Sequence, residues 1–201
     1  MRRVVLALTI LAAAGLVASA SGAAGFQRHA VPAQGISLAV PASWIVVDSS
    51  FSQTLIDRVS KQNPKLAPYI AQLGQPGSPM RFVALDPAVR HAFATNVNVV
   101  VAPARRGTTF AHYTAALLAG LRAIASGPIT KRVGTIGGAK ALRVSYRFRF
   151  AFGQMRTVQT LQYAFLRGPG SIVVTYTTLP VEATRYAPTF QQSAASIRFA
   201  R

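Results

Sequence analysis

Residues 143–165 read RVSYRFRFAFGQMRTVQTLQYAF, and this stretch decides the fold class. Apolar residues alternate with arginine and other polar residues before Gly153, which is the period of a β-strand with two different faces. Gly153-Gln154 has glycine first, as a two-residue type II′ hairpin turn requires. The stretch therefore predicts two long antiparallel strands joined by a tight turn.

The expected register of this hairpin sets Phe152 opposite Met155, and therefore Tyr146 opposite Leu161. Most apolar residues then lie on one face of the hairpin, and a slip of one residue would divide them between both faces. This register also gathers basic residues on the other face. The candidate basic contact face consists of Arg143, Arg147, Arg149 and Arg156.

Two interpretations of these arginines remain open. In the first, they form a cationic patch for carboxylate or phosphate groups, which a planar guanidinium binds well. In the second, the aliphatic stems of the arginines merely cover a solvent-exposed strand. Ser145, Thr160 and Gln162 on the same face support this interpretation, because they are ordinary residues of a solvent-exposed strand. The aromatic residues point away from the arginines, so we do not expect an aromatic platform for nucleic acid.

The rest of the sequence predicts pairs and runs of strands with helices inserted between them. We expect strands at 36–40, 44–47, 81–86, 96–103, 129–136, 171–178 and 196–200. We expect helices from Ser49 or Ser50 to about Val59, from Asn63-Pro64 to Leu73, from Thr109 to Gly127-Pro128, and at 186–194 with Pro188 in the first turn. Strands joined by tight turns, with helices between the hairpins, predict an α+β fold with a mainly antiparallel sheet.

The first 24 residues have the order of a secretory signal peptide. Arg2 and Arg3 precede an uncharged apolar run and then small residues, so we expect cleavage near Ala20 to Ala24 and a single domain over 25–201. The alternative is an uncleaved membrane anchor, although the apolar run is shorter than the ~20 residues of a spanning helix. We therefore expect a protein secreted to the cell envelope or the extracellular space.

The chain is strongly basic, with 22 Lys and Arg against 4 Asp and Glu. Loss of the leader would leave a net charge of about +16, which attracts polyanions and makes contacts sensitive to salt. For an exported protein, the expected partners are an acidic protein, an acidic envelope polymer or an anionic membrane surface, and nucleic acid is not expected. The alternative is a charge without function, since the basic residues are scattered along the chain.

The sequence contains no recognisable catalytic or cofactor motif. It has no cysteine, which excludes disulfides, thiolate ligands and a lipidated N-terminal Cys. Three histidines lack metal-ligand spacing; they are His29, His91 and His112. Four acids are too few and too scattered to suggest a catalytic pair; they are Asp48, Asp57, Asp86 and Glu182. We therefore expect a protein that is not an enzyme and binds no metal or cofactor.

Several landmarks together resemble the PsbP-like family, in particular its exported bacterial members related to the lipoprotein LpqN. They are ISLAVPASW, NPKL, FVALDP, FATNVNVVV, GGAKALRVSY, QTLQYAF and the closing SIRF, and they span roughly residues 33 to 200. The resemblance implies an α/β/α sandwich with a central, mainly antiparallel sheet and helices on its faces. It also implies binding to other proteins without catalysis.

Two functions from different classes remain as expectations. The first is a secreted, non-catalytic binding or accessory domain of the cell envelope that contacts an acidic protein or a polyanionic surface. The second is a carrier or sensor of a small apolar ligand held between sheet and helix, where Tyr146, Phe148 and Tyr163 would line a cavity. We expect a monomer in either case.

Overall fold

The computed structural model describes residues 25–31, 35–48, 57, 60–62, 64, 79–152 and 154–200. The expected leader lies outside the described residues, and so does almost all of the two helices expected between Ser49 and Leu73. Among the described residues, no helix is long and apolar enough to cross a membrane.

The described elements follow the expected order closely. The strands are β1 (Phe26–Val31), β2 (Ile36–Pro41), β3 (Ile45–Asp48), β4 (Met80–Leu85), β5 (Asn96–Pro103), β6 (Thr130–Ile136), β7 (Ala139–Phe152), β8 (Gln154–Arg167), β9 (Gly170–Thr178) and β10 (Arg198–Phe199). The helices are α3 (Phe110–Ile124), the 3-10 turn η1 (Pro180–Glu182) and α4 (Ala183–Ala195).

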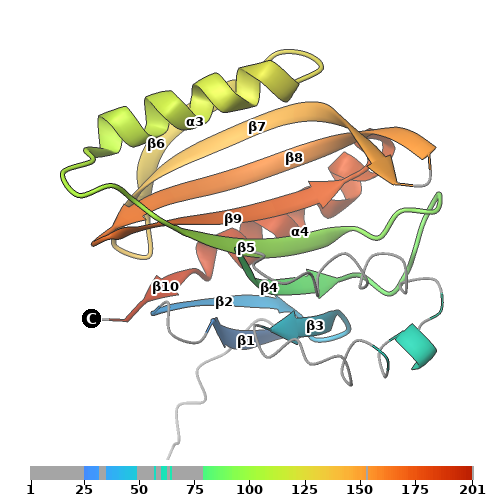
Figure 1. Cartoon of the computed structure of the whole chain (residues 1–201). Coiled ribbons are helices and arrows are strands. Elements are labelled where there is room, and N and C mark those ends of the chain that lie inside the picture. The colour runs from blue at the N-terminus through green and yellow to red at the C-terminus, as the bar shows by residue number, and fades with distance from the viewer. Residues whose placement is uncertain are drawn as a thin grey trace, which may run out of the picture.

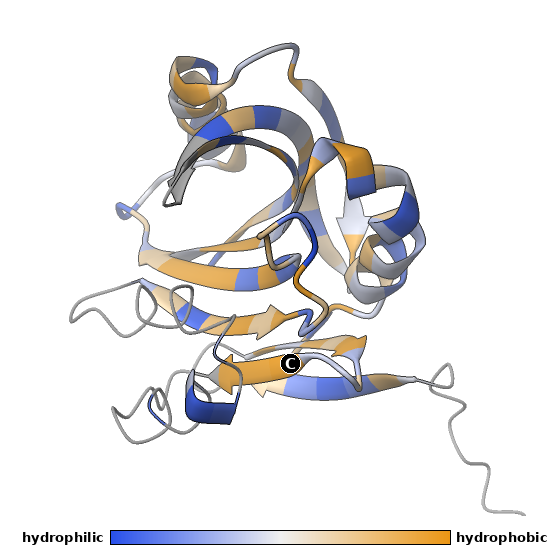
Figure 2. Ribbon diagram, turned by 90° about the vertical axis from the view of Figure 1, so that its right-hand side faces the viewer, coloured by the Kyte–Doolittle hydropathy of each residue, from blue (hydrophilic) through white to orange (hydrophobic). Residues whose placement is uncertain are grey.

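The strands form two antiparallel sheets. The large sheet has the order β3-β4-β5-β9-β8-β7-β6, and the small one has the order β1-β2-β10. Figure 1 shows α3 along one side of the large sheet, α4 behind it and the small sheet below. The view along the strands in Figure 2 places the large sheet between α3 and α4. The α+β fold with helices on both faces of a mainly antiparallel sheet is confirmed.

The opening strands separate instead of staying together. β2 belongs to the small sheet, whereas β3 is an edge strand of the large one. The separation arises because β2 pairs with β1, a strand that the sequence did not predict. The polar stretch FQRHAV of β1 buries only Val31 fully, so its hydrophobic pattern is weak. β1 is therefore held by main-chain pairing more than by burial.

Helix α3 lies where the most regular hydrophobic pattern of the chain predicted a helix, so this prediction is confirmed. Its N-cap is Thr109, whose Oγ1 accepts a hydrogen bond from the His112 amide at 3.2 Å. Leu118 and Leu121 are buried against one face of the large sheet. The sheet residues of this cluster are Leu142, Val144, Tyr146 and Ala164.

Helix α4 covers the other face and differs from its expected limits. It begins at Ala183, not near Tyr186, because η1 leads directly into it. Pro188 therefore lies inside the helix and not in its first turn. Its missing N–H leaves the carbonyl of Thr184 without a helical partner, and Thr184 is exposed, so water can bind that carbonyl. Tyr186 and Phe190 are buried in the main core beside Tyr176.

The register of the β7–β8 hairpin differs by one residue from the expected register. Phe152 pairs with Gln154, so the predicted two-residue turn at Gly153-Gln154 is wrong. As a result Tyr146 lies opposite Thr160, and Arg147 lies opposite Gln159. The expectation assumed that one face of the hairpin is exposed to solvent. In the structure both faces are covered over part of their length, so apolar residues are needed on both.

Candidate functional site: an arginine face

Four exposed arginines share one face of the outer part of the large sheet. Arg132 of β6 lies directly opposite Arg143 of β7. Residues opposite each other, and residues two apart on one strand, point to the same face. We call this set the arginine face; its members are Arg132, Arg143, Arg147 and Arg149. Three of the four arginines proposed from the sequence are therefore brought together.

Arg132 is the member that sequence reasoning missed. Its place depends on how β6 pairs with β7, and the pattern of β6 alone is uninformative because nearly all of the strand is exposed. The signal that would have found it is the Gly137-Gly138 turn. A two-residue turn there sets Ile136 opposite Ala139, and counting back from this pair reaches Arg132 and Arg143.

Arg156 does not belong to the arginine face. In the observed register it lies opposite Phe150, whereas Thr157 lies opposite Arg149. Its side chain is therefore on the other side of the sheet, where its Nη1 donates to the main-chain oxygen of His91 at 2.7 Å. The expectation that Arg156 joins the other three is wrong, because it followed from the hairpin register that the structure corrects.

The charge of the arginine face is not balanced within the described part of the chain. The ion pair between His91 and Glu182 lies away from these arginines. Like charges directly opposite each other on adjacent strands destabilise a sheet, and Arg132 and Arg143 are such a pair. Binding of an external anion would relieve this repulsion.

Arg147 differs from its neighbours because side-chain hydrogen bonds hold it. Its Nε donates to Oε1 of Gln159 at 2.9 Å. The Gln159 amide nitrogen in turn donates to Oγ of Ser145 at 3.0 Å and to the main-chain oxygen of Tyr146 at 3.2 Å. The guanidinium of Arg147 is therefore oriented before any ligand arrives.

A cavity of about 350 Å³ lies beside Arg147. It is open to solvent on one side and is lined by the loop after α3, the start of β6, and β7 with β8. The polar residues that line it are Ser126, Thr130, Ser145, Arg147 and Gln159. No acidic residue is among the described residues that line it.

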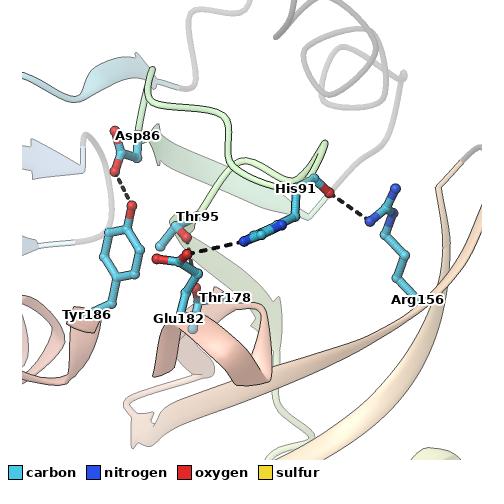
Figure 3. Close-up of polar contacts among 7 residues, drawn as sticks. All are labelled: Asp86, His91, Thr95, Arg156, Thr178, Glu182 and Tyr186. Carbon is cyan, nitrogen blue, oxygen red and sulfur yellow. Dashed lines mark hydrogen bonds and ion pairs between the residues drawn. The ribbon is translucent and has the colours of Figure 1, made fainter. Parts of the chain in front are cut away.

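A second polar cluster ties α4 to the connection between β4 and β5 (Figure 3). The Tyr186 hydroxyl donates to Oδ2 of Asp86, and the other carboxylate oxygen of Asp86 accepts from the Ala88 amide at 2.8 Å. Burial, and next the hydrogen bond to Asp86, raises the pKa of Tyr186. Nε2 of His91 lies 3.6 Å from Oε1 of Glu182. The Tyr186–Asp86 bond holds α4 to this connection, and the His91–Glu182 contact holds η1 to it.

The turn in this cluster has an unusual backbone. His91 and Ala92 have φ of +49° and +52°, and Arg90 pairs with Phe93 across them. These angles are those of a type I′ turn, which favours Asn and Gly. The hydrogen bond from Arg156 to His91 and the His91–Glu182 contact hold this turn in place. Among the described residues, no group of three or more His, Cys, Asp or Glu could hold a metal ion.

The cavity expected for a small apolar ligand is not formed by the residues named for it. Tyr146 packs in the cluster beneath α3. Tyr163 belongs to the main core on the opposite face, where it meets Tyr176 edge to face. Their separation follows from the corrected register, so the expected lining of Tyr146, Phe148 and Tyr163 is wrong.

Comparison with known proteins shows similarity at the level of the fold. No family model matches the chain, and no curated protein matches its sequence. The solution structure of cyanobacterial PsbP (CyanoP) from Synechocystis sp. PCC 6803 is similar over 90% of this chain and 95% of that chain, with a TM-score of 0.54 and 12% identity. The crystal structure of LpqN, involved in cell envelope biogenesis of Mycobacterium tuberculosis, is similar over 88% of this chain and 92% of that chain, with a TM-score of 0.53 and 12% identity. The chain therefore has the PsbP-like fold.

Proposed function

We propose that this protein is an exported, non-catalytic binding domain of the cell envelope. It contacts an acidic protein or a polyanionic surface through the arginine face. The observation that carries the proposal is the presence of four exposed guanidinium groups on one face, without an ion pair to any described acidic residue. Such an arrangement attracts anions, because acidic residues of the same molecule do not neutralise its positive charge.

The spacing of the arginines suits an extended partner. Side chains two residues apart on a strand are about 7 Å apart, and adjacent strands are about 5 Å apart. Arg147 and Arg149 are thus neighbours along β7, and Arg132 and Arg143 are neighbours across two strands. A partner with several regularly placed negative charges would contact all four, so binding should depend strongly on salt.

The location proposed for the protein has two supports. The first 24 residues have the order of an export signal. The structure of LpqN, which has the same fold, is of a protein described as involved in cell envelope biogenesis. A peripheral contact with an anionic membrane surface is compatible with the arginine face. We propose that the protein acts as a monomer and requires no cofactor.

Retention on immobilised polyphosphate and on vesicles that contain phosphatidylglycerol tests the proposal as salt is raised. The unmodified protein should be retained at low salt and released steeply. Replacing Arg147 and Arg149 together by serine should lower the slope of log affinity against log salt by roughly 1 for each arginine that contacts an anionic group.

The matched control replaces Arg105 and Arg106 by serine. Both are exposed in the loop between β5 and α3, and this variant removes the same charge from another part of the surface. An equal loss of retention in both double variants would show that total charge is responsible and that the arginine face is not a binding site. No retention of the unmodified protein at low salt would contradict polyanion binding itself.

A further inference from the structure

We propose that the cavity beside Arg147 is a binding site for a phosphate group. This inference rests on the proposed function, and it gives one part of the arginine face a defined ligand chemistry. The cavity of about 350 Å³ is large enough for a phosphate ester with part of the molecule that carries it.

The hydrogen bonds among the side chains that line the cavity use the acceptor atoms of these side chains. Several of their N–H and O–H donors remain available for a ligand. Oε1 of Gln159 accepts from Nε of Arg147, and Oγ of Ser145 accepts from the Gln159 amide. A guanidinium has five N–H donors, so the Nη groups of Arg147 remain for a ligand, as does the Ser145 hydroxyl proton. A ligand that supplies only acceptors and carries negative charge fits this inventory.

The opposite wall of the cavity is fixed to the same strand. The amide of Ser126 donates to the main-chain oxygen of Arg147 at 2.8 Å, and Ala125 forms an isolated bridge with Phe148. Ser126 therefore stays close to Arg147 although it follows α3 in the chain. The site is held together before binding, which lowers the entropy cost of binding a small group.

Phosphate fits better than carboxylate because donors line more than one wall. The Arg147 fork, the Ser145 hydroxyl and the Ser126 hydroxyl belong to β7 and to the loop after α3. A carboxylate accepts in a single plane, whereas a phosphate has oxygens in several directions. A phosphate monoester also carries close to two negative charges, which suits a site next to the Arg132–Arg143 pair.

The test is an NMR titration of the protein with inorganic phosphate, and separately with acetate, at constant ionic strength and neutral pH. The Nε–Hε resonance of Arg147 and the amide of Ser126 are followed. Phosphate should shift both saturably, and acetate should not. Gln159→Leu removes the group that orients Arg147, and it should weaken phosphate binding about tenfold or more.

A second variant guards against misfolding of the first. Gln159→Glu keeps a partner for Arg147 but supplies its own negative charge, so phosphate binding should be lost while the fold is retained. The control variant is Arg105→Ser, which should bind phosphate as the unmodified protein does. Equal, unsaturable responses to phosphate and acetate would overturn the proposed pocket. Polyanion retention that still depends on Arg147 and Arg149 would then leave the proposed function standing.

Larger ligands distinguish the sources of the phosphate. The protein is bound to polyphosphate in one experiment and to phosphatidylglycerol vesicles in another. Inorganic phosphate is then added, and the release of the protein is measured. If inorganic phosphate releases the protein only from the vesicles, the bound phosphate group is that of a lipid headgroup. If it releases the protein only from polyphosphate, the bound group belongs to a polymer. Tighter binding of polyglutamate than of polyphosphate would overturn the phosphate assignment in favour of an acidic protein.

Discussion

Replacing Thr160 by valine tests the observed register of the β7–β8 hairpin. In the register expected from the sequence, Thr160 is exposed beside Arg147, and the change would alter stability little. In the structure Thr160 is 0% exposed, and its hydroxyl has no hydrogen-bond partner among the described residues. An unsatisfied buried hydroxyl costs about 1 to 3 kcal/mol, and a buried methyl contributes about 0.8 kcal/mol. Both terms favour valine, so we expect Thr160→Val to stabilise the protein by at least about 1 kcal/mol.

The assay is urea unfolding followed by the fluorescence of Trp44, the single tryptophan, which is buried at 8% exposure. A thermal scan should show an increase of about 2 to 4 °C for each kcal/mol. The matched control is Thr178→Val, on the next strand and also 0% exposed. Its hydroxyl lies 2.8 Å from that of Thr95, so this variant removes a buried hydrogen bond and should lose about 1 to 2 kcal/mol.

The two valine variants should therefore change stability in opposite directions. A neutral Thr160→Val would show that Thr160 is exposed, and it would support the register expected from the sequence. A destabilising Thr160→Val would show that its hydroxyl has a hydrogen-bond partner. Either result, together with the expected loss in Thr178→Val, would refute the reasoning.

Two further predictions concern other parts of the fold. Gly137 has φ of +56°, and an added Cβ would lie 2.5 Å from the main-chain oxygen of Ile197, so Gly137→Ala should cost well over 1 kcal/mol in urea unfolding. Gly138→Ala, where φ is +78° and no atom lies within 4 Å, should cost only about 1 kcal/mol, and equal losses would contradict the predicted clash. Burial raises the pKa of Tyr146 to about 12, so its contribution to stability is complete below pH 10 and is lost as pH rises towards 12. Tyr146→Phe should make unfolding less dependent on pH in this range, and an unchanged dependence would contradict the burial effect.

The candidate site was predicted in part from the sequence. Alternation along β7 placed Arg143, Arg147 and Arg149 on one face, because the period of a strand is a local property. Arg156 was misplaced and Arg132 was missed, because both assignments require the pairing of neighbouring strands. The local pattern shows neither the hydrogen bonds that orient Arg147 nor the position of the loop that lines its cavity.

The fold shows the same division between local and long-range information. The strand and helix patterns, the Gly137-Gly138 turn and the capped helix at Thr109 follow from nearby residues. The short strand β1 was missed because it gains its stability from pairing with β2. The start of α4 was placed too late because the 3-10 turn before it has no hydrophobic period.

By itself, the sequence determined the fold class, most of the element order and an unusually basic surface with little acidic compensation. These properties depend on hydrophobic period, turn residues and composition, all of which act locally. The tertiary structure alone decided which residues share a face. Helix α3 and the small sheet with α4 cover opposite sides of the large sheet, so apolar residues occur on both faces of the β7–β8 hairpin. A hydrophobic pattern divided in this way cannot choose between two registers that differ by one residue, and only contacts between distant segments make that choice.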